Sequence, residues 1–171
     1  LEGLGNAIIG VTTYNTVDNN ITIALLAEVG SHGPVSALNI DNVSMTAPED
    51  RVASLAALNF GLILHCSATG TMSNGDAGGL VVYNEGTILK SRAAVNMSLG
   101  TGGGLVDHND GVISLSRASG SGFSGGLAGS SEGLISDSYA LGDVGGYQAG
   151  GLVGYNSGTI QRSFASGNAL I

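Results

Sequence analysis

The segment Leu80-Val-Val-Tyr-Asn-Glu-Gly-Thr-Ile88 is one of five related copies in this chain of 171 residues. Successive copies start 25, 25, 22 and 25 residues apart, at Leu55, Leu80, Leu105, Leu127 and Leu152. A repeat of this length is typical of a solenoid, in which each copy forms one structural unit that stacks on the next. Each local motif therefore has to be weighed against its place in the repeat.

Several positions of the repeat hold the same residue in every copy. With the first Leu as position 0, position 6 is always Gly, position 8 is always Ile and position 13 is always Ala. Position 11 is Cys66 in the first copy and Ser in the others. The large residues at 0 and 8 would stack in a shared core, while the residues at 11 and 13 would face one side of a strand because they are two apart. The broken alternation between 8 and 11 predicts a bend between two strands.

An Asn-x-Gly pattern at positions 4 to 6 predicts a turn in each copy. Glycine adopts positive φ without a steric penalty, and Asn hydrogen-bonds to nearby backbone. Asn side chains stacked at one corner can also hydrogen-bond to each other along the stack. Ser131 takes the Asn position in the fourth copy. The other predicted turn residues are Asn59, Gly61, Asn84, Gly86, Asn109, Gly111, Gly133, Asn156 and Gly158.

These positions predict an all-β fold, a parallel β-helix with 22–25 residues per coil in its regular part. A helical solenoid is disfavoured because each interior Gly would cost roughly 1 kcal/mol. A sandwich or up-and-down barrel would need hairpin turns and would not preserve the register of the repeat. Residues 1–51 are less regular, with expected strands at 21–27 and 35–45, and we expect them to form about two further coils. The prediction is a single solenoid domain over residues 1–171, about seven coils in all.

The composition excludes several classes of partner. The net charge is −8 and only five residues are basic, so a nucleic acid or an anionic membrane surface is not an expected partner. No apolar stretch approaches the ~18 residues of a membrane-spanning helix, so membrane insertion is not expected either. The chain begins with Leu1 rather than Met, and we expect it to be a piece of a longer protein.

Two copies carry a resemblance to a known repeat family. Gly78-Gly-Leu-Val-Val-Tyr-Asn-Glu-Gly-Thr-Ile88 and Gly150-Gly-Leu-Val-Gly-Tyr-Asn-Ser-Gly-Thr-Ile160, each followed by Ser-x-Ala, resemble the GLUG repeat, and five such copies cover residues 52–171. The resemblance implies a right-handed parallel β-helix in a secreted or surface protein of bacteria. The parent would be a filamentous-haemagglutinin-type adhesin or an immunoglobulin A protease of the zinc class. Nothing here matches the His-Glu-x-x-x-His metal helix of those proteases, so proteolysis is not implied.

No motif in the sequence makes a convincing catalytic site. Gly129-Ser-Ser-Glu-Gly133 fits the nucleophile-elbow pattern, but Ser131 and Gly133 already belong to repeat positions. The pair His65 and Cys66 is a poor dyad because adjacent residues of a strand point to opposite faces. We therefore expect no enzymatic activity and no cofactor.

Two groups of residues are candidate binding sites. Asp107, Asn109 and Asp110 could supply oxygen ligands to a cation such as Ca²⁺. Position 12 faces outward in each copy, and stacked Arg and aromatic side chains there could bind a host glycan or a host protein. The position-12 candidates are Arg92, Arg117, Tyr139 and Phe164.

The resulting expectation is a structural and adhesive segment of an extracellular bacterial adhesin. We expect the protein to be secreted or located at the bacterial cell surface. A polysaccharide-binding or polysaccharide-cleaving module and an accessory region of a secreted protease remain alternatives. Open coil ends present unpaired strand edges, so we also expect a tendency to associate end to end.

Overall fold

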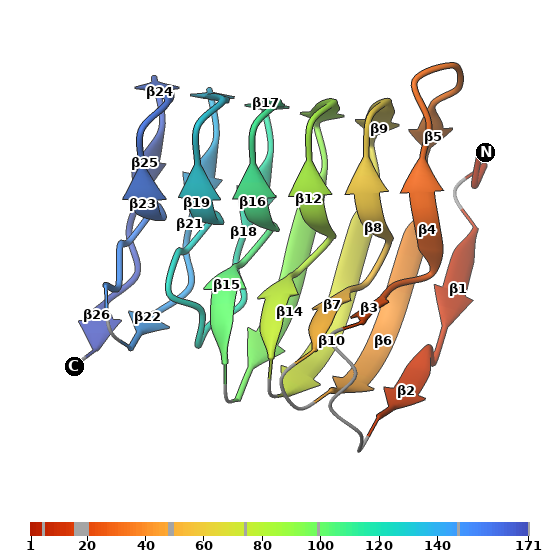
Figure 1. The fold of residues 1–171 in the computed structure, drawn as a ribbon, viewed down its shortest axis with the longest axis horizontal. Coiled ribbons are helices and arrows are strands. Elements are labelled where there is room, and N and C mark those ends of the chain that lie inside the picture. The colour runs from red at the N-terminus through yellow and green to blue at the C-terminus, as the bar shows by residue number, and fades with distance from the viewer. Residues whose placement is uncertain are drawn as a thin grey trace.

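The computed structural model describes residues 1–4, 6–15, 21–47, 50–73, 75–98, 100–146 and 148–170. Within these ranges the chain contains no helix, and parallel strands stack as a β-solenoid of about six turns. The coils follow one another along the long axis, with the two chain ends at opposite ends of the stack (Figure 1). None of the described segments forms a helix that could cross a membrane.

Strands that occupy the same place in successive coils pair into four parallel sheets, numbered here in chain order. Sheet 1 contains eight strands, β1 (Ala7–Ile9), β2 (Thr12–Tyr14), β6 (Asn39–Thr46), β10 (Ser67–Ser73), β14 (Arg92–Met97), β18 (Arg117–Ala118), β21 (Tyr139–Ala140) and β25 (Phe164–Ala165). Sheet 2 contains β3 (Thr22–Ile23), β7 (Arg51–Ala53), β11 (Asp76–Gly78) and β15 (Thr101–Gly103).

The repeat segments themselves form the other two long sheets. Sheet 3 contains β4 (Leu26–Val29), β8 (Ala56–Asn59), β12 (Val81–Asn84), β16 (Val106–Asn109), β19 (Ala128–Ser131) and β23 (Val153–Asn156). Sheet 4 contains β5 (Val35–Ser36), β9 (Leu62–Leu64), β13 (Thr87–Leu89), β17 (Val112–Ser114), β20 (Leu134–Ser136) and β24 (Thr159–Gln161). A short fifth sheet pairs β22 (Val144–Gly145) with β26 (Ala169–Leu170).

The strand register is the one that the repeat predicts. Ile88 pairs with Ile63 on one side and with Ile113 on the other, and Asn84 pairs in the same way with Asn59 and Asn109. Sheets 3 and 4 have six strands each. Instead of the expected seven coils there are about six turns. The described part of residues 1–15 adds β1 and β2 beside β6 and a bridge from Glu2 to Ser36, which is less than a whole coil.

The predicted core positions are buried between the sheets. Ile63, Ile88, Ile113 and Ile135 are all 0% exposed, and the Leu at position 0 and the Ala at position 13 are buried in the first four copies. In the last coil Ile160 is 38% exposed, because β24 pairs only with β20. Each inner coil thus buries its apolar positions against a coil on either side, as repeat architectures require.

The predicted bend between positions 8 and 11 is made by one residue in the left-handed conformation. Position 10 has φ between 48° and 54° in every copy, although none of these residues is a glycine: His65, Lys90, Leu115, Asp137 and Arg162. The serine that follows at position 11 does more than fill space. Ser91 Oγ donates to the carbonyl of Leu89 at 3.1 Å and accepts from the backbone N–H of Cys66 in the preceding coil at 3.1 Å. The same side chains therefore hold the bend and tie adjacent coils together.

The glycines at position 6 are required for a different reason from the one the sequence suggested. Positive φ is recorded at several other glycines, but Gly61, Gly86 and Gly111 do not adopt it. A Cβ on Gly86 would instead clash with the carbonyl oxygen of Gly61 in the preceding coil, and one on Gly111 would clash with that of Gly86. The close approach of successive backbones at this corner leaves no space for a side chain.

The expected row of Asn side chains runs along this corner. Asn59 Nδ2 donates to Asn84 Oδ1 at 2.7 Å, and Asn84 Nδ2 donates to Asn109 Oδ1 at 2.7 Å. Asn109 Nδ2 continues the row to Ser131 Oγ at 3.0 Å. All four side chains are buried, so these hydrogen bonds satisfy polar groups that water does not reach.

Candidate binding surface

The four position-12 residues lie in one straight row on the outer face of sheet 1. Arg92 pairs with Arg117, Arg117 with Tyr139, and Tyr139 with Phe164. The neighbouring residues at position 13, such as Ala93 and Ala118, point into the core. Alternation along each short strand therefore directs position 12 outward, and adjacent members of the row are ~4.8 Å apart.

The row changes character along its length. Arg92 and Arg117 are exposed, whereas the rings of Tyr139 and Phe164 stack on one another with their centroids 5.2 Å apart and their planes 7° apart. Phe164 is still 56% exposed. The row thus presents two guanidinium groups followed by an aromatic platform.

Lys90, which the sequence reasoning did not select, adds a third positive charge beside the row. A cavity of about 350 Å³ lies where sheet 4 meets sheet 1, and it is lined by His65, Ser67, Lys90, Ser91, Arg92 and Arg117, among others. Three of the five basic residues of an acidic chain therefore line one hollow. The signal was present in the sequence, because positions 10 and 12 together hold Lys90, Arg92 and Arg117 within 28 residues.

These three cations have no ion-pair partner among the described residues. In the described part of the chain, none of Lys90, Arg92 and Arg117 forms an ion pair, whereas Arg162 binds Asp137 through two hydrogen bonds of 2.6 and 2.8 Å. The guanidinium of Arg162 lowers the pKa of the Asp137 carboxyl. Like charges directly opposite each other on neighbouring strands are destabilising. The pairing of Arg92 with Arg117 is therefore expected to cost stability.

The predicted cation site is not assembled from its three residues. The side-chain amide of Asn109 is engaged in the buried row with Asn84 and Ser131. Asp107 contacts His108, and Asp110 is exposed in the turn between Asn109 and Gly111. Among the described residues, no group of three or more His, Cys, Asp and Glu side chains has the arrangement of a metal site.

The two nucleophile patterns occupy buried structural positions. Ser131 is 0% exposed, and its hydroxyl accepts the hydrogen bond from Asn109. Cys66 is 1% exposed, and burial raises the pKa of its thiol. A buried thiol that stays protonated is a poor nucleophile. Both residues belong to the hydrogen-bonding and packing positions of the repeat.

Comparison with known proteins gives one match. The GLUG motif matches residues 145–169, which form the last coil from β22 to β26. The strands of the preceding copies pair in register with one another and with this segment, which is consistent with a GLUG-repeat region. No curated protein and no solved structure matches the chain.

Proposed function

We propose that this chain is a structural and adhesive segment of an extracellular bacterial protein, without catalytic activity of its own. Two features support the proposal, the resemblance to GLUG repeats of secreted and surface proteins and the unpaired cationic row on sheet 1. The stack gives such a protein a rigid spacer, because its length grows with each added coil. The outer row gives it a surface for contact with a host.

The ligand that best fits this surface is a glycan carrying carboxylate or sulfate groups. Guanidinium groups bind such anions through paired hydrogen bonds, and Lys90 supplies a further charge beside them. The stacked rings of Tyr139 and Phe164 continue the row and offer a flat apolar surface to a sugar ring. An extended acidic chain could thus lie along the solenoid axis and contact one coil after another.

The single observation that carries the proposal is the unpaired row of Arg92 and Arg117, and it defines the test. Binding of the wild-type chain to an array of sulfated, sialylated and neutral glycans should be confined to the acidic ones and should weaken as salt rises. The double variant Arg92→Ala, Arg117→Ala should lose at least about tenfold in affinity. Arg162→Ala is the matched control, since it removes the same charge from a guanidinium that is already paired with Asp137. Equal binding by the double variant and the wild type would refute the proposal.

The absence of catalysis has a separate test. The purified chain should release no reducing ends or unsaturated sugars from acidic polysaccharides that it binds. Turnover that persists in the Arg92→Ala, Arg117→Ala variant would favour the polysaccharide-cleaving alternative at another site.

A further inference from the structure

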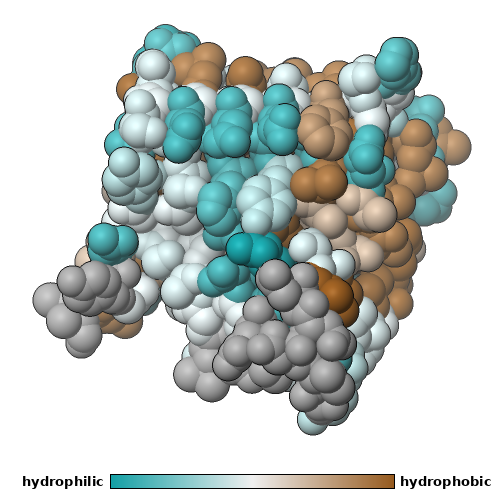
Figure 2. Space-filling model, viewed as in Figure 1, coloured by the Kyte–Doolittle hydropathy of each residue, from teal (hydrophilic) through white to brown (hydrophobic). Residues whose placement is uncertain are grey.

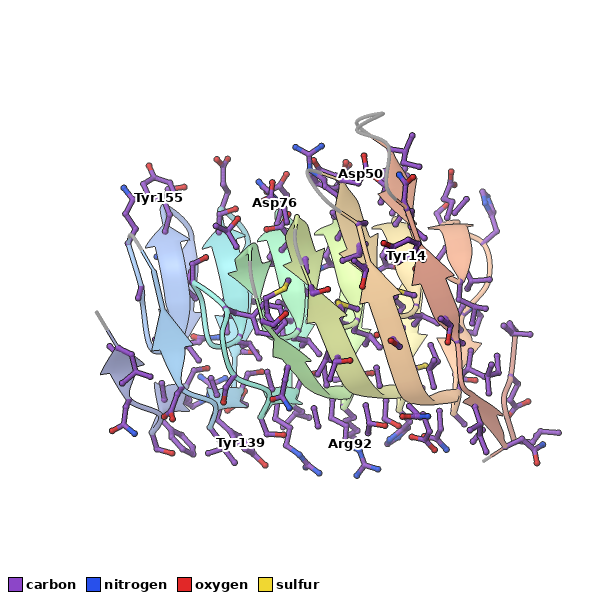
Figure 3. The ribbon with its side chains drawn as sticks, turned by 90° about the horizontal axis from the view of Figure 1, so that it is seen from below. Tyr14, Asp50, Asp76, Arg92, Tyr139 and Tyr155 are labelled. Carbon is purple, nitrogen blue, oxygen red and sulfur yellow. The ribbon has the colours of Figure 1, made fainter. Side chains whose placement is uncertain are left out.

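A second hollow lies on the other side of the solenoid, where sheet 2 meets sheet 3. It has a volume of about 270 Å³, and its lining includes Asp76, Thr101, Asp107, His108, Ser130 and Tyr155. In Figure 3, Asp76 and Tyr155 lie along one side of the molecule, and Arg92 and Tyr139 lie along the opposite side. Figure 2 shows hydrophilic side chains over the central coils of the sheet 3 face and hydrophobic ones over the N-terminal coils. This hollow, called the groove below, is therefore distinct from the cationic row.

Two features of the sequence create the groove. Gly78 and Gly103 allow sheet 2 to approach sheet 3 backbone to backbone, because a Cβ on either would clash with the carbonyl of Val81 or Val106. Position 2 of the repeat then decides how much space remains. It holds Ala57, Val82, Asp107, Gly129 and Gly154 in successive coils. Val82 fills its coil and is 0% exposed, whereas the two glycines leave the groove open.

Asp107 is the unusual member of this position. Its side chain is only 5% exposed, and its Oδ2 lies 2.9 Å from Nδ1 of His108. Neither of these two atoms completes a hydrogen bond of ordinary geometry. Burial raises the pKa of the Asp107 carboxyl, and this effect outweighs the lowering by the neighbouring His108. A buried carboxylate with unused hydrogen-bonding capacity is costly. The fold does not require a carboxylate at position 2, because the preceding coil has Val82 there.

The chemistry around Asp107 selects the class of ligand. Two carboxylates disfavour an anion, while the hydroxyl of Ser130 offers a further polar contact. The hydroxyls of Thr101 and Ser124 are already bonded to Asp76 and to the backbone of Gly102. Tyr155 is 61% exposed at one end and can pack against a sugar ring. Ligand pockets commonly enclose roughly 300–1,000 Å³, so a hollow of about 270 Å³ suits one ring at a time. These properties match a ligand that is rich in hydroxyl donors and has no negative charge.

We propose that the groove binds a neutral sugar unit of a polysaccharide, whose hydroxyls donate hydrogen bonds to Asp107 and Asp76. The sugar would complete the hydrogen bonding of Asp107 Oδ2, which the protein leaves unfinished. Because the groove follows the solenoid axis across β16, β19 and β23, the rest of the polysaccharide can continue along it. The role is binding and not hydrolysis. Ser130 is the register partner of His108, yet no hydrogen bond joins the two, as a nucleophile and its base would require.

The decisive experiment measures binding to neutral oligosaccharides. Mannan, β-glucan, galactan and chitin oligosaccharides would be titrated by calorimetry against the wild-type chain and the variants Asp107→Val and Tyr155→Ala. Asp107→Val copies the residue of the preceding coil, so at pH 9, where the pair with His108 no longer contributes, it should fold with an unchanged or higher Tm. It should still lose at least about tenfold in affinity. Tyr155→Ala removes an exposed ring and should weaken binding without changing the fold.

The controls separate the groove from the cationic row. The double variant Arg92→Ala, Arg117→Ala should bind the neutral oligosaccharides as the wild type does, even though it is expected to lose acidic glycans. The proposal is overturned if the wild type binds none of the four neutral probes, or if Asp107→Val binds them with wild-type affinity. Either result would leave the adhesive function of the opposite face untouched.

Discussion

Asn84 Nδ2 donates to Asn109 Oδ1 across adjacent coils at 2.7 Å, and both side chains are about 99% buried or more. Asn84 and Asn109 each use the amide nitrogen toward the next coil and the amide oxygen toward the previous one, whereas the amide oxygen of Asn59 accepts from the backbone N–H of Gly61. The repeat therefore continues through its side chains as well as through its backbone. Loss of Asn84 would therefore leave Asn59 Nδ2 and Asn109 Oδ1 without their partners in the row.

Replacing Asn84 with Ala should destabilise the solenoid by about 2 kcal/mol, since Asn59 and Asn109 would each lose a buried hydrogen bond. Asn84→Ser should cost less, because Ser131 already serves at this position in the fourth copy. Urea unfolding followed by circular dichroism measures both variants. A cost below about 0.5 kcal/mol for Asn84→Ala would show that the row contributes little.

Gly86→Ala should be among the most destabilising single substitutions in the chain, at about 3 kcal/mol or more. The added Cβ would collide with the backbone of Gly61 and could be relieved only by separating two coils. Gly33→Ala is the matched control, since its Cβ would meet no atom within 4 Å. Similar unfolding midpoints for the two variants would contradict the close approach at position 6.

Leu115→Gly should be more stable than Leu115→Ala by about 0.5–1 kcal/mol. Leu115 has φ of 50°, a conformation that costs a residue with a Cβ roughly 1–2 kcal/mol. Part of the gain is offset by the greater backbone freedom of glycine in the unfolded chain. The side chain is 52% exposed, so truncation removes little packing. Thermal unfolding of the two variants compares them directly, and a less stable glycine variant would contradict this account.

The pair formed by Asp107 and His108 should make the solenoid less stable as the pH rises. The close contact with the Asp107 carboxyl, 2.9 Å from its Nδ1, raises the pKa of His108 above its ordinary 6.5. This contribution to stability is therefore complete below pH 6.5 and is lost as the pH passes the raised value. The pKa of Asp107 is also raised from its ordinary 3.8, chiefly by burial, so its ionisation lowers stability in the same direction. The positive charge of Arg51 lowers the pKa of both Asp107 and His108, and the negative charge of Asp76 raises both.

The measurement is the Tm of the wild type and of His108→Gln between about pH 5 and pH 9. The advantage of the wild type should shrink through the pH range just above 6.5. An advantage that grows with pH would mean that the imidazole is not held in its charged form by Asp107.

The last coil should mediate association between copies. Ile160 is 38% exposed where its equivalents in four earlier coils are fully buried, and β23 and β24 each have one unpaired edge. Ile160→Lys places a charge at this edge, a common device against pairing of strand edges. Sedimentation velocity should show oligomers of the wild type that the variant lacks. A wild type that stays monomeric at high concentration would exclude end-to-end association of this chain.

The sequence predicts the solenoid well because its information is periodic. Residues such as Ile88 and Asn84 recur at fixed places, and stacking in register is the arrangement that buries all copies at once. Residues 1–15 have no such pattern, and for this reason the sequence predicts about seven coils where the structure has about six turns. The left-handed bend at position 10 was missed in detail, because His65, Lys90 and Leu115 share no chemistry that favours positive φ.

The candidate surfaces are only partly predictable, because the repeat shows which residues share a column but not how neighbouring sheets are placed. Position 12 is visible in the sequence because outward residues of one column form a row. Lys90 belongs to another column, and its place beside Arg92 depends on the angle between sheets 4 and 1. The groove was not predicted at all, since it depends on how closely Gly78 and Gly103 bring sheet 2 to sheet 3.

The direction of the hydrogen bonds between coils has a mechanical consequence. These bonds lie nearly along the long axis, so tension applied at the two chain ends would load the outermost coil first and peel the coils away one at a time. A coil that occupies ~4.8 Å of the stack would release a 25-residue segment of roughly 80–90 Å when fully extended. The chain would thus lengthen in steps under shear and absorb energy at each one.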